Sequence, residues 1–165
     1  MKIIINPIGT IHSPYPDPEG VPIQGVFAKN IRGRVEVFPE FAEGLVDLEG
    51  FSHIILIYYL HQVKGYALRC KPFLDTQEHG VFATRAPRRP NPIGISVVRL
   101  LGINDNILDI EGVDIVEGTP LLDIKPYVSD FDVRKDIKNG WYQHAGNRVQ
   151  IVADNRFIQT EQKKG

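Results

Sequence analysis

The stretch from Gly80 to Ser96, GVFATRAPRRPNPIGIS, sets Arg85, Arg88 and Arg89 between prolines. Proline fixes its own φ and restricts the residue before it, so such a loop loses few backbone states when it orders. A guanidinium is a permanently charged, planar fork of five donors. The pattern therefore predicts a preorganised receptor for an anionic or planar group, with a solvated surface turn as the alternative.

Two further stretches place polar groups where strands are expected to end. His61 and Gln62 follow the most apolar run of the chain, and residues 114–120, DIVEGTP, form an acidic turn before another strand-like run. Polar groups at a strand terminus often line a site, and the exposed backbone and carboxylates of such a turn could face a cation. A plain strand exit and a well-made turn are the respective alternatives.

Several familiar sites are unsupported. The chain has no GxGxxG, no GxxxxGK[ST] and no HExxH pattern. Its 5 histidines are scattered without ligand spacing, so no metal is expected, and its single cysteine, Cys70, excludes an internal disulfide. A net charge of −1 gives no global attraction to nucleic acid, so an RNA partner would need a local cationic patch.

The elements that position these residues are mostly short strands. Apolar and β-prone runs predict strands over residues 3–5 and 8–12, 34–38, 53–60, 93–101, 107–110, 121–127 and 149–153, and a strand-like start at 81–84. Residues 34–38 and 93–97 alternate, whereas 53–60 is continuously apolar. Residues 25–28 are short and β-prone, 39–47 favour a helix, 61–79 read as loop, and Asn104–Asn106 should close a hairpin. Many short strands with Gly/Pro turns predict a mainly β barrel or sandwich. We expect residues 1–150 to form one domain and 151–165 a fraying extension.

Taken together, the quoted stretches resemble a known family. GVFATRAPRRPNPIGISVVRL, GTIHSPY, FSHIILIYYLHQ and VDIVEGTPLLDIKPY resemble, in order, motifs of the TsaA-like family, also called TrmO. The similarity runs from about Gly9 to about Tyr127. It implies a single-domain β-barrel that binds S-adenosylmethionine and acts as a homodimer. Characterised members methylate the exocyclic amine of threonylcarbamoyl-adenosine beside the tRNA anticodon.

The resemblance also implies site residues. Those expected to contact the cofactor are Gln24, Gly25, His61, Gln62, Arg89, Asn91, Val97, Glu117, Gly118, Thr119 and Pro120. Substrate is expected to meet Arg85, Arg88 and Tyr127, with Lys29, Arg32 and Arg34 as further phosphate contacts. The catalytic base is not identified, and longer members carry a C-terminal domain that is not seen here.

The expected protein is thus a cytoplasmic tRNA methyltransferase. The longest apolar run, residues 54–60, is too short to span a bilayer. Two alternatives remain open at this point. One is a methyltransferase that acts on another acceptor, and the other is a non-catalytic RNA- or nucleotide-binding module.

Overall fold

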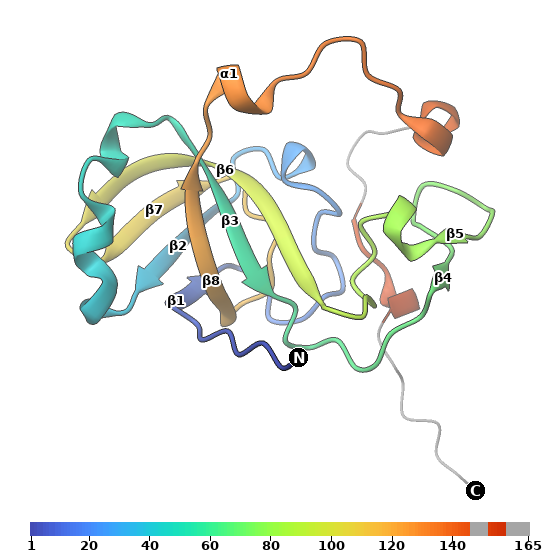
Figure 1. The fold of residues 1–165 in the computed structure, drawn as a ribbon, viewed down its shortest axis with the longest axis horizontal. Coiled ribbons are helices and arrows are strands. Elements are labelled where there is room, and N and C mark those ends of the chain that lie inside the picture. The colour runs from blue at the N-terminus through green and yellow to red at the C-terminus, as the bar shows by residue number, and fades with distance from the viewer. Residues whose placement is uncertain (146–151, 158–165) are drawn as a thin grey trace, which may run out of the picture.

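A closed antiparallel barrel is the centre of the computed structural model, which describes residues 1–145 and 152–157 (Figure 1). Its strands follow the order β1-β2-β7-β6-β3-β8. They are β1 (Gly9–His12), β2 (Arg32–Val37), β3 (His53–Tyr59), β6 (Ile93–Asn104), β7 (Ile107–Glu111) and β8 (Thr119–Pro126). The predicted mainly β barrel is therefore confirmed, and a sandwich is excluded.

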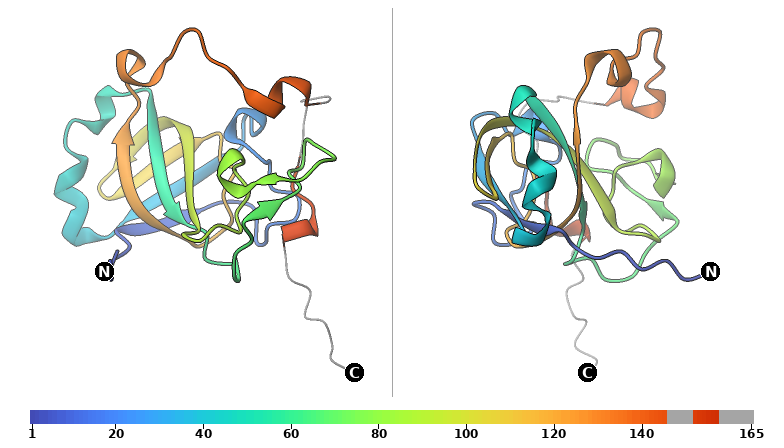
Figure 2. Two further views of the ribbon diagram at one scale, coloured as in Figure 1. Left: turned by 45° about the vertical axis from the view of Figure 1, so that its right-hand side comes forward. Right: turned by 60° about the vertical axis from the view of Figure 1, so that its left-hand side comes forward.

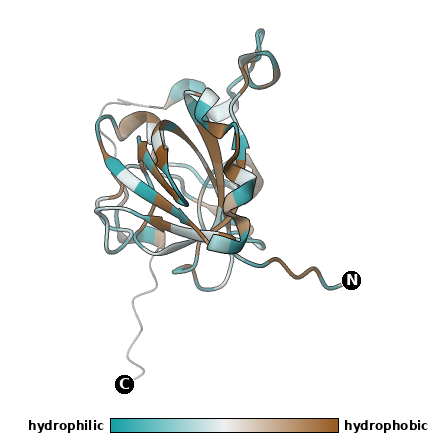
Figure 3. Cartoon of the chain, turned by 90° about the vertical axis from the view of Figure 1, so that its left-hand side faces the viewer, coloured by the Kyte–Doolittle hydropathy of each residue, from teal (hydrophilic) through white to brown (hydrophobic). Residues whose placement is uncertain are grey.

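Alternation along the strands builds the barrel core. In β3, Ile54, Leu56 and Tyr58 point inward and are buried, whereas the residues between them face outward. Successive side chains of a strand point to opposite faces, so every second residue reaches the interior. The same spacing brings Ile11, Val35, Val98, Leu108, Ile110 and Leu121 into one cluster. Figure 3 shows hydrophobic segments, in brown, along the barrel strands.

The hairpin expected around residues 104–106 is present and is longer than predicted. Strand β6 extends to Asn104 and pairs with β7, and Asp105 occupies the left-handed region at φ 53°. Aspartate tolerates this conformation because its short polar side chain can bond locally. The register shifts between Leu100 and Gly102, where the strand bulges as it curves around the barrel.

A small lobe packs beside the barrel. It contains the two-stranded sheet of β4 (Arg69–Cys70) and β5 (His79–Gly80), followed by a 3-10 helix at Val81–Ala83. After β8, the chain passes through α1 (Ser129–Asp132) and crosses to this lobe (Figure 2). There Trp141 stacks on His79 at 4.8 Å between ring centroids, and its Nε1 donates to Ala83 O at 2.7 Å. These contacts anchor the returning chain to the lobe.

Several predicted strands are wrong. Residues 3–5 are exposed and belong to no strand, and β1 begins only at Gly9. Residues 81–84 form a 3-10 turn, since Thr84 Oγ1 and N both donate to Val81 O. Residues 25–28 also turn, because Phe27 N donates to Gln24 O and Ala28 N to Gly25 O. Residues 61–79, read as loop, contain β4 and the first residue of β5.

The remaining elements differ only in detail. The helix predicted over 39–47 is a 3-10 helix, Pro39–Leu45. Of residues 149–153, the first three lie outside the described residues, and Val152 forms an isolated bridge with Pro22. Short 3-10 helices also occur at Gly25–Phe27, Leu48–Gly50, Gly140–His144 and Asn155–Phe157.

Candidate functional site

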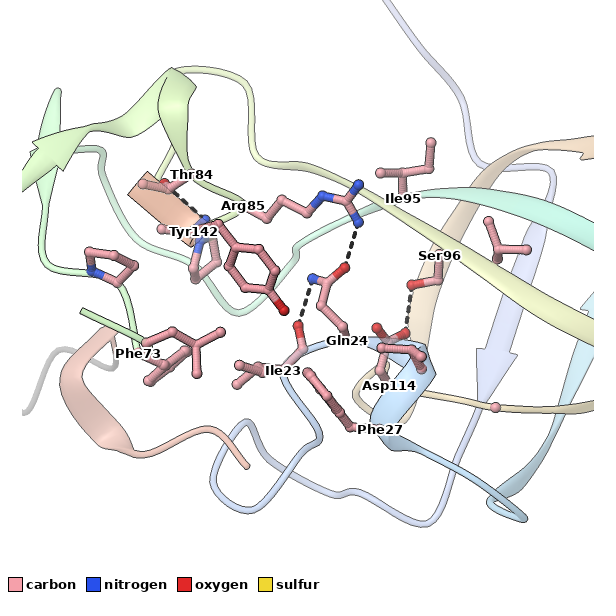
Figure 4. A pocket seen from close by; sticks show the side chains of 18 of the residues that line it. Ile23, Gln24, Phe27, Phe73, Thr84, Arg85, Ile95, Ser96, Asp114 and Tyr142 are labelled. Atoms are coloured by element: carbon pink, nitrogen blue, oxygen red, sulfur yellow. Dashed lines mark hydrogen bonds between the residues drawn. The ribbon is translucent and has the colours of Figure 1, made fainter. Parts of the chain in front are cut away.

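A cavity of about 1050 Å³ lies between β6 and the small lobe (Figure 4). The barrel contributes Ser96 and Val97 from β6 and Asp114 from the segment after β7. The opposite wall comes from the arginine loop and from the returning C-terminal segment. Residues far apart in the sequence therefore meet at one concave surface, which is the usual setting of a small-molecule site.

Gln24 and Arg85 meet in the middle of this cavity. Arg85 Nη1 donates to Gln24 Oε1 at 2.5 Å, and Gln24 Nε2 donates to Ile23 O at 2.6 Å. Within residues 1–145 and 152–157, no carboxylate lies within ion-pair distance of Arg85. A guanidinium held by a neutral amide keeps its charge available for an anionic ligand.

Asp114 forms the barrel side of the cavity. Ser96 Oγ donates to Asp114 Oδ1 at 2.5 Å, and the Tyr58 hydroxyl lies 2.9 Å from Ser96 Oγ. Burial raises the pKa of Asp114 to about 6, although hydrogen bonds from Ser96 and from backbone amides, and the charge of Arg85, act in the opposite direction. Burial also raises the pKa of Tyr58, so its phenol stays protonated.

Aromatic side chains line the other parts of the cavity. Phe27 comes from the turn after Gln24, Phe73 and Phe82 from the small lobe, and Trp141 and Tyr142 from the returning segment. Flat apolar rings beside hydrogen-bonding groups suit a ligand that carries a planar base.

Some expected cofactor residues lie in this cavity, whereas others form a second group. Gln24, Gly25 and Val97 line the cavity, as does Arg85, which was expected to meet substrate. The second group lies at the end of β3 and the start of β8. Here His61 Nδ1 is 3.4 Å from Thr119 Oγ1, and burial lowers the pKa of His61.

The Glu117–Pro120 turn is fixed to the start of the chain. Glu117 Oε1 lies 2.8 Å from His12 Nδ1, and its Oε2 accepts from Ser13 N at 2.6 Å. Gly118 adopts φ +72°, which glycine permits without strain, and donates its N–H to Ile11 O. Pro120 lies opposite Thr10 in the β1–β8 pair. The GTIHSPY and EGTP motifs are therefore one structural unit.

Charge interactions of His12 with Glu117 and Glu36 stabilise the contact between the GTIHSPY and EGTP motifs. The hydrogen bond to Glu117 raises the pKa of His12, and Glu36 adds to the effect from 3.4 Å at the other ring nitrogen. Burial opposes ionisation of Glu117, but hydrogen bonds from His12 and the Ser13 amide outweigh it and lower the pKa of that carboxyl. A histidine whose two nitrogens both face carboxylates is stabilised in its protonated form.

The arginine loop separates its three guanidiniums. Arg89 Nη1 donates to Val81 O at 3.0 Å, Thr84 O at 2.8 Å and Ala86 O at 3.4 Å, so this group organises its own loop. Arg88 is half-buried, and its Nε has no partner among the described residues. Only Arg85 of the three lines the large cavity.

The remaining predicted residues lie at the periphery. Asn91 is exposed and its carbonyl accepts from Ile93 N at 2.8 Å, and Gln62 is exposed as well. Tyr127 packs edge-on against His53, a cavity residue, at 6.4 Å between ring centroids. Lys29 also lines the cavity, whereas Arg32 and Arg34 lie around a separate groove of about 610 Å³.

Sequence patterns did not indicate several residues of the site. Ser96, which lines the cavity, and Tyr58, which contacts Ser96 from the barrel core, lie in predicted strands, and Phe73, Trp141 and Tyr142 of the cavity belong to no motif. Asp114 was noted only as part of an acidic turn. The signal that could have found it is an aspartate followed by apolar residues directly after a strand.

Residues 1–145 and 152–157 contain no group of three or more His, Cys, Asp or Glu side chains that could hold a metal ion. In the same residues no helix is long and apolar enough to cross a membrane.

Comparison with known proteins agrees with this architecture. The profile of the tRNA-methyltransferase O N-terminal domain matches residues 10–133. A crystal structure of TrmO from Pseudomonas aeruginosa superposes with a TM-score of 0.72 at 40% identity, covering 86% of this chain and 63% of that chain. The chain therefore spans less than two thirds of that solved protein.

Curated relatives point the same way. A probable S-adenosyl-L-methionine-binding protein of Pyrococcus abyssi is 56% identical over 159 residues, which are 96% of this chain and 86% of the relative. The human tRNA (adenine(37)-N6)-methyltransferase is 32% identical over 145 residues, 82% of this chain and 32% of that protein. Profile, structure and relatives agree, and the chain belongs to the family of the tRNA-methyltransferase O N-terminal domain.

Proposed function

We propose that this protein is an S-adenosylmethionine-dependent methyltransferase that modifies the exocyclic amine of threonylcarbamoyl-adenosine next to the tRNA anticodon. The observation that carries the proposal is the cavity between β6 and the small lobe, where Gln24, Gly25, Arg85 and Val97 of separate motifs meet. The family and the names of the relatives support both the cofactor and the reaction class.

The cavity fits a cofactor of this kind. S-adenosylmethionine carries a purine, a sulfonium cation and an amino-acid tail, and a volume of about 1050 Å³ accommodates a nucleoside ligand with room for a second base. Phe27, Phe73 and Tyr142 offer apolar surface for planar rings, and Arg85 offers a charge for an anionic group. When bound, the cofactor supplies an electrophilic methyl group.

The protein's own contribution is positioning and exclusion of water. Gln24 holds Arg85 in the cavity, and residues of the small lobe line the cavity together with Val97 of β6. Lys29 and Arg99 add positive charge to the cavity lining, where phosphates of an anticodon loop can be met. The roles of His61, Gln62, Arg88, Arg89, Asn91, Tyr127 and the Glu117–Pro120 turn in binding stay predictions.

A transfer assay with labelled cofactor and threonylcarbamoyl-modified tRNA tests the proposal. We expect label in the modified adenosine, and a heat-treated sample sets the background. Arg85→Ala should weaken tRNA binding about tenfold and reduce the slope of log affinity against log salt by about one, because one cation–phosphate contact is lost. Arg69→Ala, an exposed arginine outside the cavity, should leave both quantities unchanged.

The same assay separates the two alternative functions. Cofactor binding by calorimetry without transfer to any tRNA, together with transfer to another acceptor, would indicate a different substrate. Cofactor binding without consumption in the presence of every acceptor tried would indicate a non-catalytic module. If the assay with threonylcarbamoyl-modified tRNA leaves the modified adenosine without label, the proposal is contradicted.

The proposal includes a homodimer that forms through the outer face of β3 and β6. On β6, Ile93, Ile95 and Val97 are 41%, 52% and 45% exposed. They pair with Tyr59, Ile57 and Ile55 of β3, which face outward beside them. A contiguous apolar surface of this kind is typical of an interaction site. Because Ile95 and Val97 also line the cavity, a second copy on this face would extend the cavity wall.

Ile93→Lys tests this interface. We expect the substitution to convert a dimer into a monomer in light scattering and to lower transfer activity, because a buried unpaired ammonium is unfavourable. Glu40→Lys adds the same side chain to an exposed position of the Pro39–Leu45 helix and should leave the dimer intact. A wild-type protein that is monomeric at micromolar concentration would contradict the dimer.

A further inference from the structure

A hydrogen-bonded series of three side chains connects the barrel interior to the cavity. Tyr58 comes from β3, Ser96 from β6 and Asp114 from the segment after β7. Ser96 Oγ has one hydrogen and donates it to Asp114 Oδ1 at 2.5 Å, so the Tyr58 hydroxyl must donate to Ser96 across the 2.9 Å contact. In this series Tyr58 donates to Ser96, and Ser96 donates to the Asp114 carboxylate.

The carboxylate at the end of this series faces the ligand side of the cavity. Asp114 lines the cavity together with Gly25, Arg85 and Val97. A Cβ built on Gly25 would stand 3.8 Å from Asp114 Oδ2, so this oxygen lies beside the stretch in which the cofactor is expected. Oδ1 is occupied by Ser96, whereas Oδ2 lies on the Gly25 side.

Several charged and hydrogen-bonding groups surround the Asp114 carboxyl. Ser96 and the backbone amides of Gly25 and Asp114 favour its charged form, as does the Arg85 guanidinium, while burial favours the neutral form. The phenols of Tyr58 and Tyr15 are both close enough to feel its charge. The pKa of Asp114, raised to about 6, makes the carboxylate a stronger base than an exposed aspartate while it stays ionised at neutral pH.

We propose that Asp114 is the proton acceptor for the methylated amine and that Ser96 and Tyr58 are its positioning residues. The inference rests on the proposed function, because it needs an amine acceptor in the cavity. The amine lone pair forms the new N–C bond, and the C–S bond breaks with its electron pair left on sulfur. The N–H bond then breaks, its electron pair stays on nitrogen, and the proton passes to Asp114 Oδ2 to give a neutral carboxyl.

Asp114 would supply the base that the reaction needs and that the sequence motifs do not identify. The exocyclic amine is a weak nucleophile, because its lone pair is delocalised into the ring, and the nitrogen must lose a proton to end neutral. General-base assistance by a positioned carboxylate typically contributes 10²–10⁴-fold. The other carboxylate among the described lining residues, Glu111, lies at the end of β7, opposite Arg32 of β2 and Arg99 of β6.

Asp114→Asn is the central test. The asparagine keeps the size of the side chain and an oxygen that can accept from Ser96, but it cannot take a proton. We expect transfer to modified tRNA to fall at least 100-fold, with the calorimetric Kd for S-adenosylmethionine within about threefold of wild type. Asp109→Asn changes a carboxylate that pairs with Arg34 and does not line the cavity, and it should retain full activity.

The pH dependence separates proton transfer from a purely structural role. Wild-type transfer should fall as pH drops through about 6, because protonation of Asp114 removes the acceptor. Ser96→Ala should move this acidic limb to higher pH, since it removes a donor that favours the carboxylate. NMR titration of the Asp114 carboxyl carbon, without any ligand, should show the same difference. The pKa of Asp114 should be higher in Ser96→Ala than in wild type.

Three results would overturn the inference. One is an active wild type with an equally active Asp114→Asn. Another is a loss of cofactor affinity that matches the loss of rate, which would make Asp114 a cofactor ligand. The third is an acidic limb that Ser96→Ala does not move. If wild type itself transfers no methyl group to modified tRNA, the proposed function fails, and the inference fails with it.

Discussion

Replacing Gly94 with alanine is expected to lower the free energy of unfolding by about 2–4 kcal/mol, combining overpacking with a lost hydrogen bond. A Cβ at this position would stand within 3.0 Å of three ring atoms of Tyr58. Gly94 lies directly opposite Tyr58 in the β3–β6 pair, and the ring lies across the glycine. To make room, the ring must tilt and give up its contact with Ser96.

Chemical denaturation of the variant and of a matched control measures this effect. Gly102 lies in the same strand, and a Cβ there would meet nothing within 4 Å. Gly102→Ala should therefore be neutral or slightly stabilising, because alanine has less freedom to lose in a strand. Equal stability of Gly94→Ala and wild type would show that the barrel accepts a different position of the Tyr58 ring.

Arg89→Ala is expected to destabilise the protein by about 2–3 kcal/mol, since the hydrogen bonds of a charged donor to backbone carbonyls are lost. Its Nη1 serves three carbonyls of the loop, those of Val81, Thr84 and Ala86, and the side chains of all three residues are buried. Without this donor the loop loses its internal support, and Arg85 is no longer held over the cavity. Activity should fall together with loop order.

Amide hydrogen exchange of residues 81–89 and thermal unfolding report on this variant. Arg89→Lys should recover part of the stability, because an ammonium can serve some of the carbonyls but lacks the planar fork. Arg69→Ala, whose nearest carboxylate oxygen, on Glu78, is 3.8 Å away at the surface, is the control. A fully ordered loop in an inactive Arg89→Ala protein would instead place Arg89 in direct contact with ligand, as the family resemblance implies.

The contrast between these arginines shows where prediction from sequence stops. The spacing of Arg85, Arg88 and Arg89 between prolines indicated a stiff loop, and the loop is indeed held by many internal contacts. The pattern did not indicate which guanidinium would turn inward to the backbone. That choice depends on carbonyls exposed by the 3-10 turn at Val81–Ala83, a turn that local β propensity concealed.

The strands of the fold could be predicted from the sequence more fully than the contacts of the arginine loop. The continuous apolar run at residues 53–59 and the alternation at residues 93–97 both indicated strands, and both are present. The alternation did not indicate the buried face of β6, because Ile93, Ile95 and Val97 point outward and Ser96 and Val98 are buried. The strand predicted over residues 3–5 failed for the complementary reason. Apolar character alone does not create a partner strand, and β1 pairs only from Gly9 onward.

What the sequence determined by itself was the mainly β class, the hairpin at Asp105 and the set of motifs, because these depend on local period, turn chemistry and residue order. Only the tertiary structure decided that Gln24 would hold Arg85 and that Tyr58, Ser96 and Asp114 would form one series. These contacts join strands and loops that are distant in the sequence, and barrel closure brings them together. The environment that makes Asp114 a candidate base therefore exists only in the folded protein.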